Sequence, residues 1–379
     1  MVGIKTRILL WCGGAITVLL MLSASRGGRH PRLPATPDID PALRESRRAF
    51  LTRRSEPPQR IGRSATPGMP DSSSSDVSSV TTNWLQQLLE AGDSQLLPRE
   101  AIDRWLASGR TNAEDLLAAR QAGGGVELLR MALSNFPKDP RVLFAASAPN
   151  DDLGGGAEGR RERIERFKAA APENALADYL SAREHLKSSR PDLAVADLMA
   201  ASQKTRFQDY TLDAVQNAEE LYLQAGKTPL EAKILGGSTT LLPHLSQLKG
   251  LARDMAALES QYLASGDAAS AENLAQMGMR LGQQLTDGEG SRFLIGQLVG
   301  LSIEQIVLAP LDEQKTFAFL QDTPAHYAKQ RNAWRAASQE SSQHAEQWMQ
   351  TATEADLLGY FDRIKIYGES EANAWLRRR

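Results

Sequence analysis

The chain has 379 residues, with 44 basic against 46 acidic side chains and a formal net charge of -2. This near-neutral balance lacks the basic excess of nucleic-acid-binding proteins, so we expect no nucleic-acid partner. The single cysteine, Cys12, excludes an intramolecular disulfide and any zinc site built on several cysteines.

Residues 1–25 have the pattern of a targeting segment. Lys5 and Arg7 precede an uncharged apolar run at residues 8–24, and small residues follow it. A helix over residues 8–24 would be roughly 26 Å long, the minimum for a membrane span. The pattern predicts either a signal anchor, which we favour, or a cleaved signal peptide. An anchor would make a single-pass membrane protein with an extracytoplasmic body, and cleavage would make a secreted or periplasmic one.

Residues 26–81 have the composition of a linker. They contain eight of the 18 prolines and end in the serine-rich run SSSSDVSS at residues 72–79. Such a segment cannot bury enough apolar surface to offset the entropy of ordering it. We therefore predict a disordered linker between the membrane segment and the remainder of the chain.

The remaining residues, 82–379, have the pattern of an all-α protein. They hold 32 basic and 40 acidic residues, which predicts a mildly acidic surface. Alanine- and leucine-rich segments alternate with breaks that contain glycine, proline or aspartate, and no sustained alternation of period two occurs. The expected helices lie at residues 83–91, 98–108, 113–121, 126–135, 140–146, 160–170, 174–187, 191–204, 210–225, 229–235, 245–265, 268–285, 291–308, 312–320, 325–351, 354–366 and 369–376.

Part of this region repeats itself. The similar segments FPKDP and APEN place Pro137 and Pro172 35 residues apart, which is the period of a helical hairpin repeat. Each proline ends one helix and allows the next to begin shortly afterwards. After the second segment, small and large side chains follow the spacing of two closely packed helices: Ala182, Ala194, Leu198 and Ala201.

The clearest unit is ALESQYLASGDAASAENLAQMG, which begins one residue before Leu258. Its packing and turn positions are Leu258, Tyr262, Gly266, Asp267, Ala271, Ala275 and Gly278. This spacing resembles the tetratricopeptide repeat family, and the resemblance covers roughly residues 111–285. Asp178 and Ser181 depart from the family pattern, because they stand where apolar residues are expected.

The resemblance implies an α-solenoid of helical hairpins over residues 82–310. Residues 311–379 would then form a C-terminal helical cap or docking module. Just before that boundary, the glycines at 278, 282, 296 and 300 predict two closely apposed helices.

The sequence has no recognisable enzyme motif. The five histidines are scattered singly, neither HExxH nor GxSxG occurs, and AGKT at residues 225–228 has the surroundings of a hairpin turn. We therefore predict no catalytic residues, no cofactor and no metal, and do not expect an enzyme.

Helical-repeat surfaces commonly bind peptides or other proteins. The leading hypothesis is therefore a non-enzymatic scaffold, anchored in the membrane or exported, that binds a protein or peptide partner. Candidate partner-binding residues, offset from the packing positions, are Tyr179, Arg183, Arg253 and Gln261. One alternative is an enzyme or regulatory subunit whose site forms between distant helices. Another is a structural envelope protein that associates with itself.

Overall fold

The computed structural model describes residues 96–149, 153–287 and 292–378, which all fall within one compact unit. Apart from two isolated β-bridges, the regular secondary structure of these residues is helical, which confirms the all-α prediction. The predicted membrane segment, the linker and the first expected helix lie outside them. Among the helices of the described ranges, none is both long and apolar enough to cross a membrane.

The helix boundaries follow the sequence-based expectation closely in most places. The helices of the first half are α5 (Arg99–Ala107), α6 (Ala113–Ala119), a π-helical turn (Arg120–Gly124), α7 (Val126–Asn135), α8 (Pro140–Ala146), α9 (Gly156–Ala170), α10 (Ala175–Lys187) and α11 (Pro191–Gln203). The later helices are α12 (Thr211–Gln224), α13 (Pro229–Thr239), α14 (Pro243–Ala264), α15 (Ala268–Asp287), α16 (Leu294–Leu308), α17 (Pro324–Met349), α18 (Glu354–Tyr367) and α19 (Glu369–Leu376).

Local sequence explains several of these boundaries. At the start of α8, the Asp139 carboxylate accepts hydrogen bonds from N–H groups of the first turn, and Pro140 needs no such bond. Thr228 and Glu231 form a reciprocal capping box at the start of α13. Gly226 has a φ of 89° in the turn before it, a conformation that glycine adopts without strain. The AGKT segment is therefore a hairpin turn, as predicted.

The prediction of a helix at residues 312–320 is wrong. This segment forms turns, and the N–H of Phe317 donates a hydrogen bond of 3.2 Å to the carbonyl of Asp322. Gln321 has a φ of 55°, a left-handed conformation that cannot continue a helix. Burial of Phe317 in the core therefore outweighs the helix propensity of the segment.

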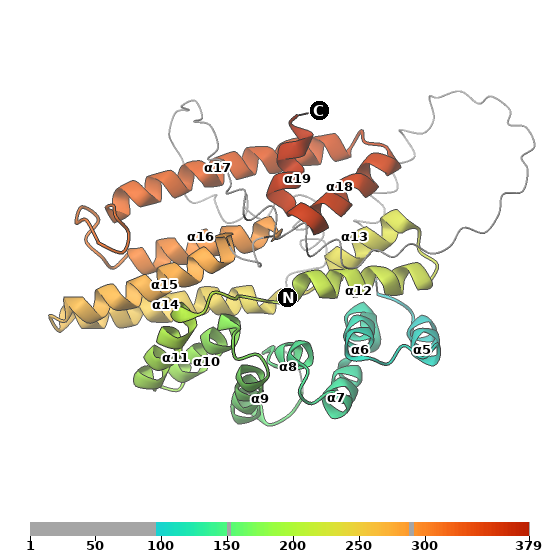
Figure 1. Cartoon of the computed structure of the whole chain (residues 1–379), viewed down its shortest axis with the longest axis horizontal. Coiled ribbons are helices and arrows are strands. Elements are labelled where there is room, and N and C mark those ends of the chain that lie inside the picture. The colour runs from blue at the N-terminus through green and yellow to red at the C-terminus, as the bar shows by residue number, and fades with distance from the viewer. Residues whose placement is uncertain (1–95, 150–152, 288–291, 379) are drawn as a thin grey trace, which may run out of the picture. The chain divides into compact units, whose positions relative to one another are not determined.

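Helices distant in sequence pack against one another. The pairs α10–α11, α12–α13 and α15–α16 each lie side by side along the chain, but α12 also packs against α6, and α14 packs against α10. Figure 1 shows the consequence: α14 lies between the short helices α10–α11 and the orange pair α15–α16, while α12 lies between α6 and α13. The chain therefore returns over its own first half.

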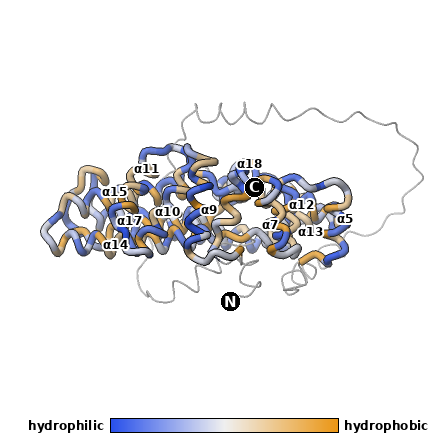
Figure 2. Tube along the Cα trace, turned by 90° about the horizontal axis from the view of Figure 1, so that it is seen from below, coloured by the Kyte–Doolittle hydropathy of each residue, from blue (hydrophilic) through white to orange (hydrophobic). Residues whose placement is uncertain are grey.

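Three hydrophobic clusters hold the described helices together. The first joins α9–α11 to α14–α16, and the second joins α5–α8 to α12 and α13. The third joins α12 and α13 to the C-terminal helices α17–α19, so these helices share a core with the preceding region. Figure 2 shows the underlying pattern, in which hydrophobic and hydrophilic residues alternate along the turns of the helices.

The small residues of the proposed repeats lie in these cores. Ala182 on α10 and Ala194, Leu198 and Ala201 on α11 are all completely buried. Small side chains allow the two helices to approach closely, while the leucine fills the space between them. The predicted packing role of these four residues is therefore confirmed.

Glycines bring α15 and α16 into close contact, as predicted. A Cβ atom added at Gly282 would lie 2.4 Å from Cγ of Glu304 and 3.0 Å from the carbonyl oxygen of Gly300. One added at Gly300 would lie 2.6 Å from the carbonyl oxygen of Gly282. The two helices can therefore keep this separation only with glycine at both positions.

Candidate functional site

Tyr179, the first of the candidate partner-binding residues, is part of the core. Its side chain is 0% exposed, and its hydroxyl donates a hydrogen bond of 2.8 Å to Oε1 of Gln284 on α15. Burial raises the pKa of the Tyr179 hydroxyl far above its ordinary value. The expectation that Tyr179 lies on an accessible face is therefore wrong, because α14 and α15 cover that side of α10.

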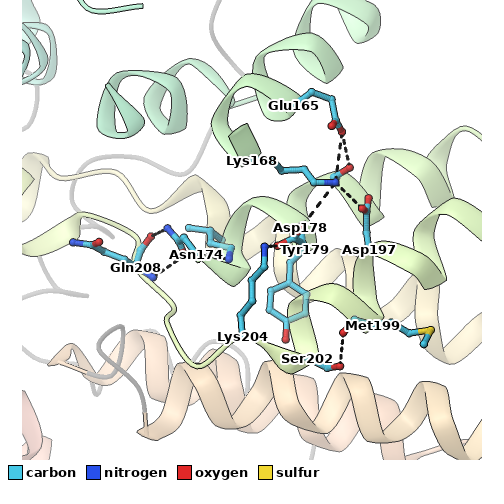
Figure 3. A network of polar contacts seen from close by, with 12 residues as sticks. Glu165, Lys168, Asn174, Asp178, Tyr179, Asp197, Met199, Ser202, Lys204 and Gln208 are labelled. Atoms are coloured by element: carbon cyan, nitrogen blue, oxygen red, sulfur yellow. Dashed lines mark hydrogen bonds and ion pairs between the residues drawn. The ribbon is translucent and has the colours of Figure 1, made fainter. Parts of the chain in front are cut away.

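A polar network surrounds the base of Tyr179 and accounts for one departure from the repeat pattern (Figure 3). Asp178 is buried between the ammonium groups of Lys168 and Lys204, and Lys168 donates a hydrogen bond of 2.6 Å to Asp197. Burial raises the pKa of Asp178, although both lysines act to lower it. The network therefore joins α9, α10 and α11 through charge at a position where an apolar contact was expected.

Ser181 is the second residue that departs from the repeat pattern. Its hydroxyl donates a hydrogen bond of 3.1 Å to Oε1 of Glu165 on α9. Both departures are thus satisfied polar contacts within the helical packing.

The other three candidates lie together along α14. Arg253 and Gln261 are exposed on it, and Arg183 reaches over from α10 to Gly250. A Cβ atom at Gly250 would lie 2.5 Å from Nη2 of Arg183, so the guanidinium occupies space that only glycine leaves free. The structure therefore brings Arg183, Arg253 and Gln261 to one side of the molecule.

A pocket of about 400 Å³ lies between α6, α8, the start of α12 and the start of α14. Leu117, Phe144 and Leu241 contribute apolar walls, and Leu241 remains 47% exposed at its edge. Charged residues around the pocket include Arg120, Arg141, Glu114 and Asp213. Its volume falls in the range of pockets that accept a small molecule or a few side chains.

An aspartate and a histidine meet in the wall of this pocket. Nε2 of His244 lies 3.1 Å from Oδ2 of Asp209, and the histidine side chain is only 1% exposed. Burial would raise the pKa of Asp209, but the nearby His244 imidazole and the hydrogen bond from the N–H of Thr211 outweigh it, so its pKa lies below the ordinary value. Asp209 is therefore held as an ion beside a buried imidazole.

The backbone at this point is strained. Tyr210 has a φ of 55°, which is unfavourable for a residue with a bulky side chain. The conformation directs the Tyr210 ring onto Phe144 and Phe167, with ring centroids 5.8 Å and 6.3 Å away. His244 completes the cluster with its ring centroid 5.5 Å from that of Phe144. Aromatic packing therefore compensates for the strain and shapes the pocket wall.

Arg160 connects the helices beneath the pocket. Its Nε donates to the carbonyl of Ser147 at 2.9 Å, its Nη1 to Oε1 of Glu184 at 2.8 Å, and its Nη2 to Gln247. All four residues are buried, and they belong to α9, α10, α14 and the end of α8. This guanidinium thus fixes the helices that form the pocket floor.

The sequence offered no sign of the pocket. Asp209 precedes α12, whereas His244 lies in the first turn of α14, and no short motif links them. Within the described ranges, no group of three or more His, Cys, Asp or Glu side chains could hold a metal ion.

No protein-family model, no curated protein and no solved structure matches this chain.

Proposed function

We propose that this protein is a non-enzymatic scaffold, anchored in the membrane or exported, that binds a protein or peptide partner through a tetratricopeptide-like helical surface. The helical hairpins with buried small residues, the positive φ of Gly266 in its turn, and the close approach of Val307 to Gly278 support the repeat interpretation. The hydrophobic segment at residues 8–24 is the basis for the proposed membrane attachment.

The observation that carries this proposal is the pocket between α6, α8, α12 and α14. Its apolar wall is rimmed by charged side chains, and Leu241 stands exposed at its edge although most leucines here are buried. Partner proteins commonly anchor themselves by inserting an apolar side chain into such a pocket. We assign the pocket this role.

Site-directed photocrosslinking tests the assignment. A photoreactive amino acid replaces Leu241 in the full-length chain, which is expressed in its native cell and irradiated. The matched control carries the same amino acid at Leu223, which is 41% exposed on α12 and does not line the pocket. We expect a discrete crosslinked protein from position 241 and none from position 223.

A second variant distinguishes pocket binding from proximity. Leu117→Gln introduces a polar group into the pocket wall, and we expect it to reduce the crosslink from position 241 while circular dichroism stays unchanged. Equal crosslinks from both positions, or no loss with Leu117→Gln, would contradict the assignment.

The Asp209–His244 pair favours a second candidate function, an enzyme or a regulatory subunit with a site between distant helices. An ionised carboxylate that orients an imidazole is a common arrangement in acid–base catalysis. Screening small molecules for thermal stabilisation of the wild type but not of His244→Gln tests this function. Stabilisation that depends on His244 would favour it over the scaffold.

Self-association is the third candidate. Leu193 and Met199 on α11 are 48% and 49% exposed, and Met199 lines a second hollow between α11 and α15. Sedimentation velocity over a range of concentrations tests it, with Met199→Gln as the variant. A wild-type dimer that becomes a monomer in the Met199→Gln variant would favour self-association.

A further inference from the structure

One side of α14 carries two cations, Lys249 and Arg253, and no acidic residue. Residues 246, 249, 250, 253, 257 and 261 fall within about a third of the circumference of the helix, because each residue turns it by about 100°. Arg253 and Gln261 on this side are exposed, and Lys249 is half-buried. Lys249 and Arg253 are four residues apart, so their charges lie on adjacent turns.

Two further guanidinium groups come from neighbouring helices. Arg183 reaches from α10 onto Gly250, and its buried Nε has no hydrogen-bond partner in the part of the chain that the structure describes. Arg335 approaches from α17 and lies close enough to Lys249 to act on its charge. We call Arg183, Lys249, Arg253 and Arg335 the α14 cationic face.

Acidic residues do not neutralise this face. Among the described residues, no carboxylate forms an ion pair with Lys249, Arg253 or Arg335. Asp254 and Glu184 act on the charge of Arg183 without forming an ion pair with it. Burial, and then the charges of Arg253 and Arg335, lower the pKa of Lys249. The cations therefore repel one another, although acidic residues outnumber basic ones in residues 82–379.

A groove continues from Arg335. It has a volume of about 360 Å³ between α16 and α17, and Leu301 and Leu308 supply apolar walls. Its buried carboxylate, Glu304, is already neutralised by Arg331, whose Nε and Nη2 donate hydrogen bonds of 2.9 Å and 2.8 Å. Arg335 thus brings an unneutralised charge to a hollow that can receive a side chain.

We propose that the α14 cationic face binds an acidic segment of the protein partner, with its carboxylates on Lys249, Arg253 and Arg335 and an apolar side chain in the adjoining groove. This inference rests on the proposed scaffold function and specifies the chemistry of the partner. Guanidinium groups favour carboxylates because their N–H groups match the two oxygens.

The burial of the cations favours a peptide over a lipid surface. Arg183, Lys249 and Arg335 are half-buried between α10, α14 and α17, and only Arg253 is exposed. A flat leaflet reaches charges that project from a protein. A flexible acidic side chain can reach those that are recessed.

Fluorescence anisotropy tests the proposal with the full-length chain in a neutral detergent. The probe is a labelled peptide of ten glutamates, and a peptide of ten lysines serves as the opposite charge. We expect the glutamate peptide to bind, and the triple variant K249Q/R253Q/R335Q to weaken its binding at least about tenfold. The salt dependence of binding should also become weaker, because fewer ion contacts form.

Two controls separate binding from folding. Arg99→Gln with Lys138→Gln removes exposed positive charges from α5 and from the turn between α7 and α8, and should leave the affinity unchanged. Lys249→Arg with Arg253→Lys keeps the charge and should retain binding. Because the cations repel one another, the triple variant should unfold at the same temperature as the wild type or at a higher one.

Three results would overturn the inference: no binding of the glutamate peptide, equal affinity of the triple and control variants, or a preference for anionic over neutral vesicles that the triple variant loses while the glutamate peptide fails to compete for it. The scaffold function is judged separately, by the crosslink from position 241. A partner that crosslinks there and is retained by the triple variant would leave the scaffold function standing and refute the acidic segment.

Discussion

The hydroxyl of Tyr179 donates a 2.8 Å hydrogen bond to Oε1 of Gln284, 105 residues further along the chain. The amide nitrogen of Gln284 in turn donates to the carbonyl of Lys204 at 2.8 Å. The glutamine of α15 thus connects α10 to the end of α11. These two hydrogen bonds therefore fix α15, in the second half of the described region, against α10 and the end of α11 in the first half.

Tyr179→Phe removes this hydrogen bond and keeps the ring. We expect the free energy of unfolding to fall by about 1–2 kcal/mol, because Oε1 of Gln284 is left buried without its donor. Urea denaturation measures the change. Tyr367→Phe is the matched control, since Tyr367 is 52% exposed, and it should change the stability by less than about 0.5 kcal/mol. Equal effects of the two substitutions would contradict this role of Tyr179.

The glycine contact between α15 and α16 predicts opposite effects of one substitution at two sites. Gly300→Ala should destabilise the protein by about 1–3 kcal/mol, because its Cβ meets the backbone of Gly282. Gly359→Ala should stabilise it by up to about 1 kcal/mol, because Gly359 lies inside α18 with no neighbouring atom within 4 Å of the added Cβ. Thermal unfolding of both variants checks the difference in sign.

Glu259 predicts a dependence of stability on pH. It is 0% exposed on α14, and burial raises its pKa to about 8. The folded state therefore retains a proton that the unfolded state has lost. As the pH rises from about 4.5 towards 8, the contribution of Glu259 to the free energy of unfolding should fall by up to about 1.4 kcal/mol per unit.

Glu259→Gln should remove this contribution, and urea denaturation between pH 5 and pH 9 compares the two proteins. The free energy of unfolding of the variant should rise steadily relative to that of the wild type as the pH increases. Glu162→Gln, at an exposed position on α9, serves as the control. Its stability should change with pH in the same way as that of the wild type. If the stability of Glu259→Gln also changed with pH in the same way as that of the wild type, the buried carboxyl would not hold its proton.

Arg160→Lys tests the connection beneath the pocket. Lysine cannot reproduce three donors in a fixed plane, so Glu184 or Gln247 loses a buried partner. We expect a loss of about 2–4 kcal/mol in the free energy of unfolding. Arg161→Lys changes the next residue, whose partner Glu158 is 84% exposed, and should alter stability by less than about 1 kcal/mol. A loss of equal size in both variants would refute the special role of Arg160.

The sequence predicted the helices well where local signals mark their ends. Pro140, Pro191 and the Thr228–Glu231 box define boundaries within a residue of those observed, because caps and prolines act over one turn of chain. The segment at residues 312–320 has no such local signal. Its shape depends on the burial of Phe317 in a core formed by distant helices.

The candidate site was less accessible to prediction. Arg183, Arg253 and Gln261 were chosen by their offset from packing positions, and they do lie on one side of α14. Tyr179 was chosen by the same rule, but that rule assumes that the first helix of each hairpin faces open space. No local pattern shows that α14 and α15 return to cover α10. The meeting of Asp209 with His244 likewise depends on tertiary packing alone.

The covering of α10 by later helices has a consequence for synthesis. A ribosome makes α10 and α11 long before it makes Gln284, so a growing chain that ends after α11 leaves Tyr179 and Phe207 without the surfaces that bury them. The first hairpins therefore cannot complete their packing one at a time, as the units of a regular repeat protein do. Their folding has to wait for α14 and α15 to be translated.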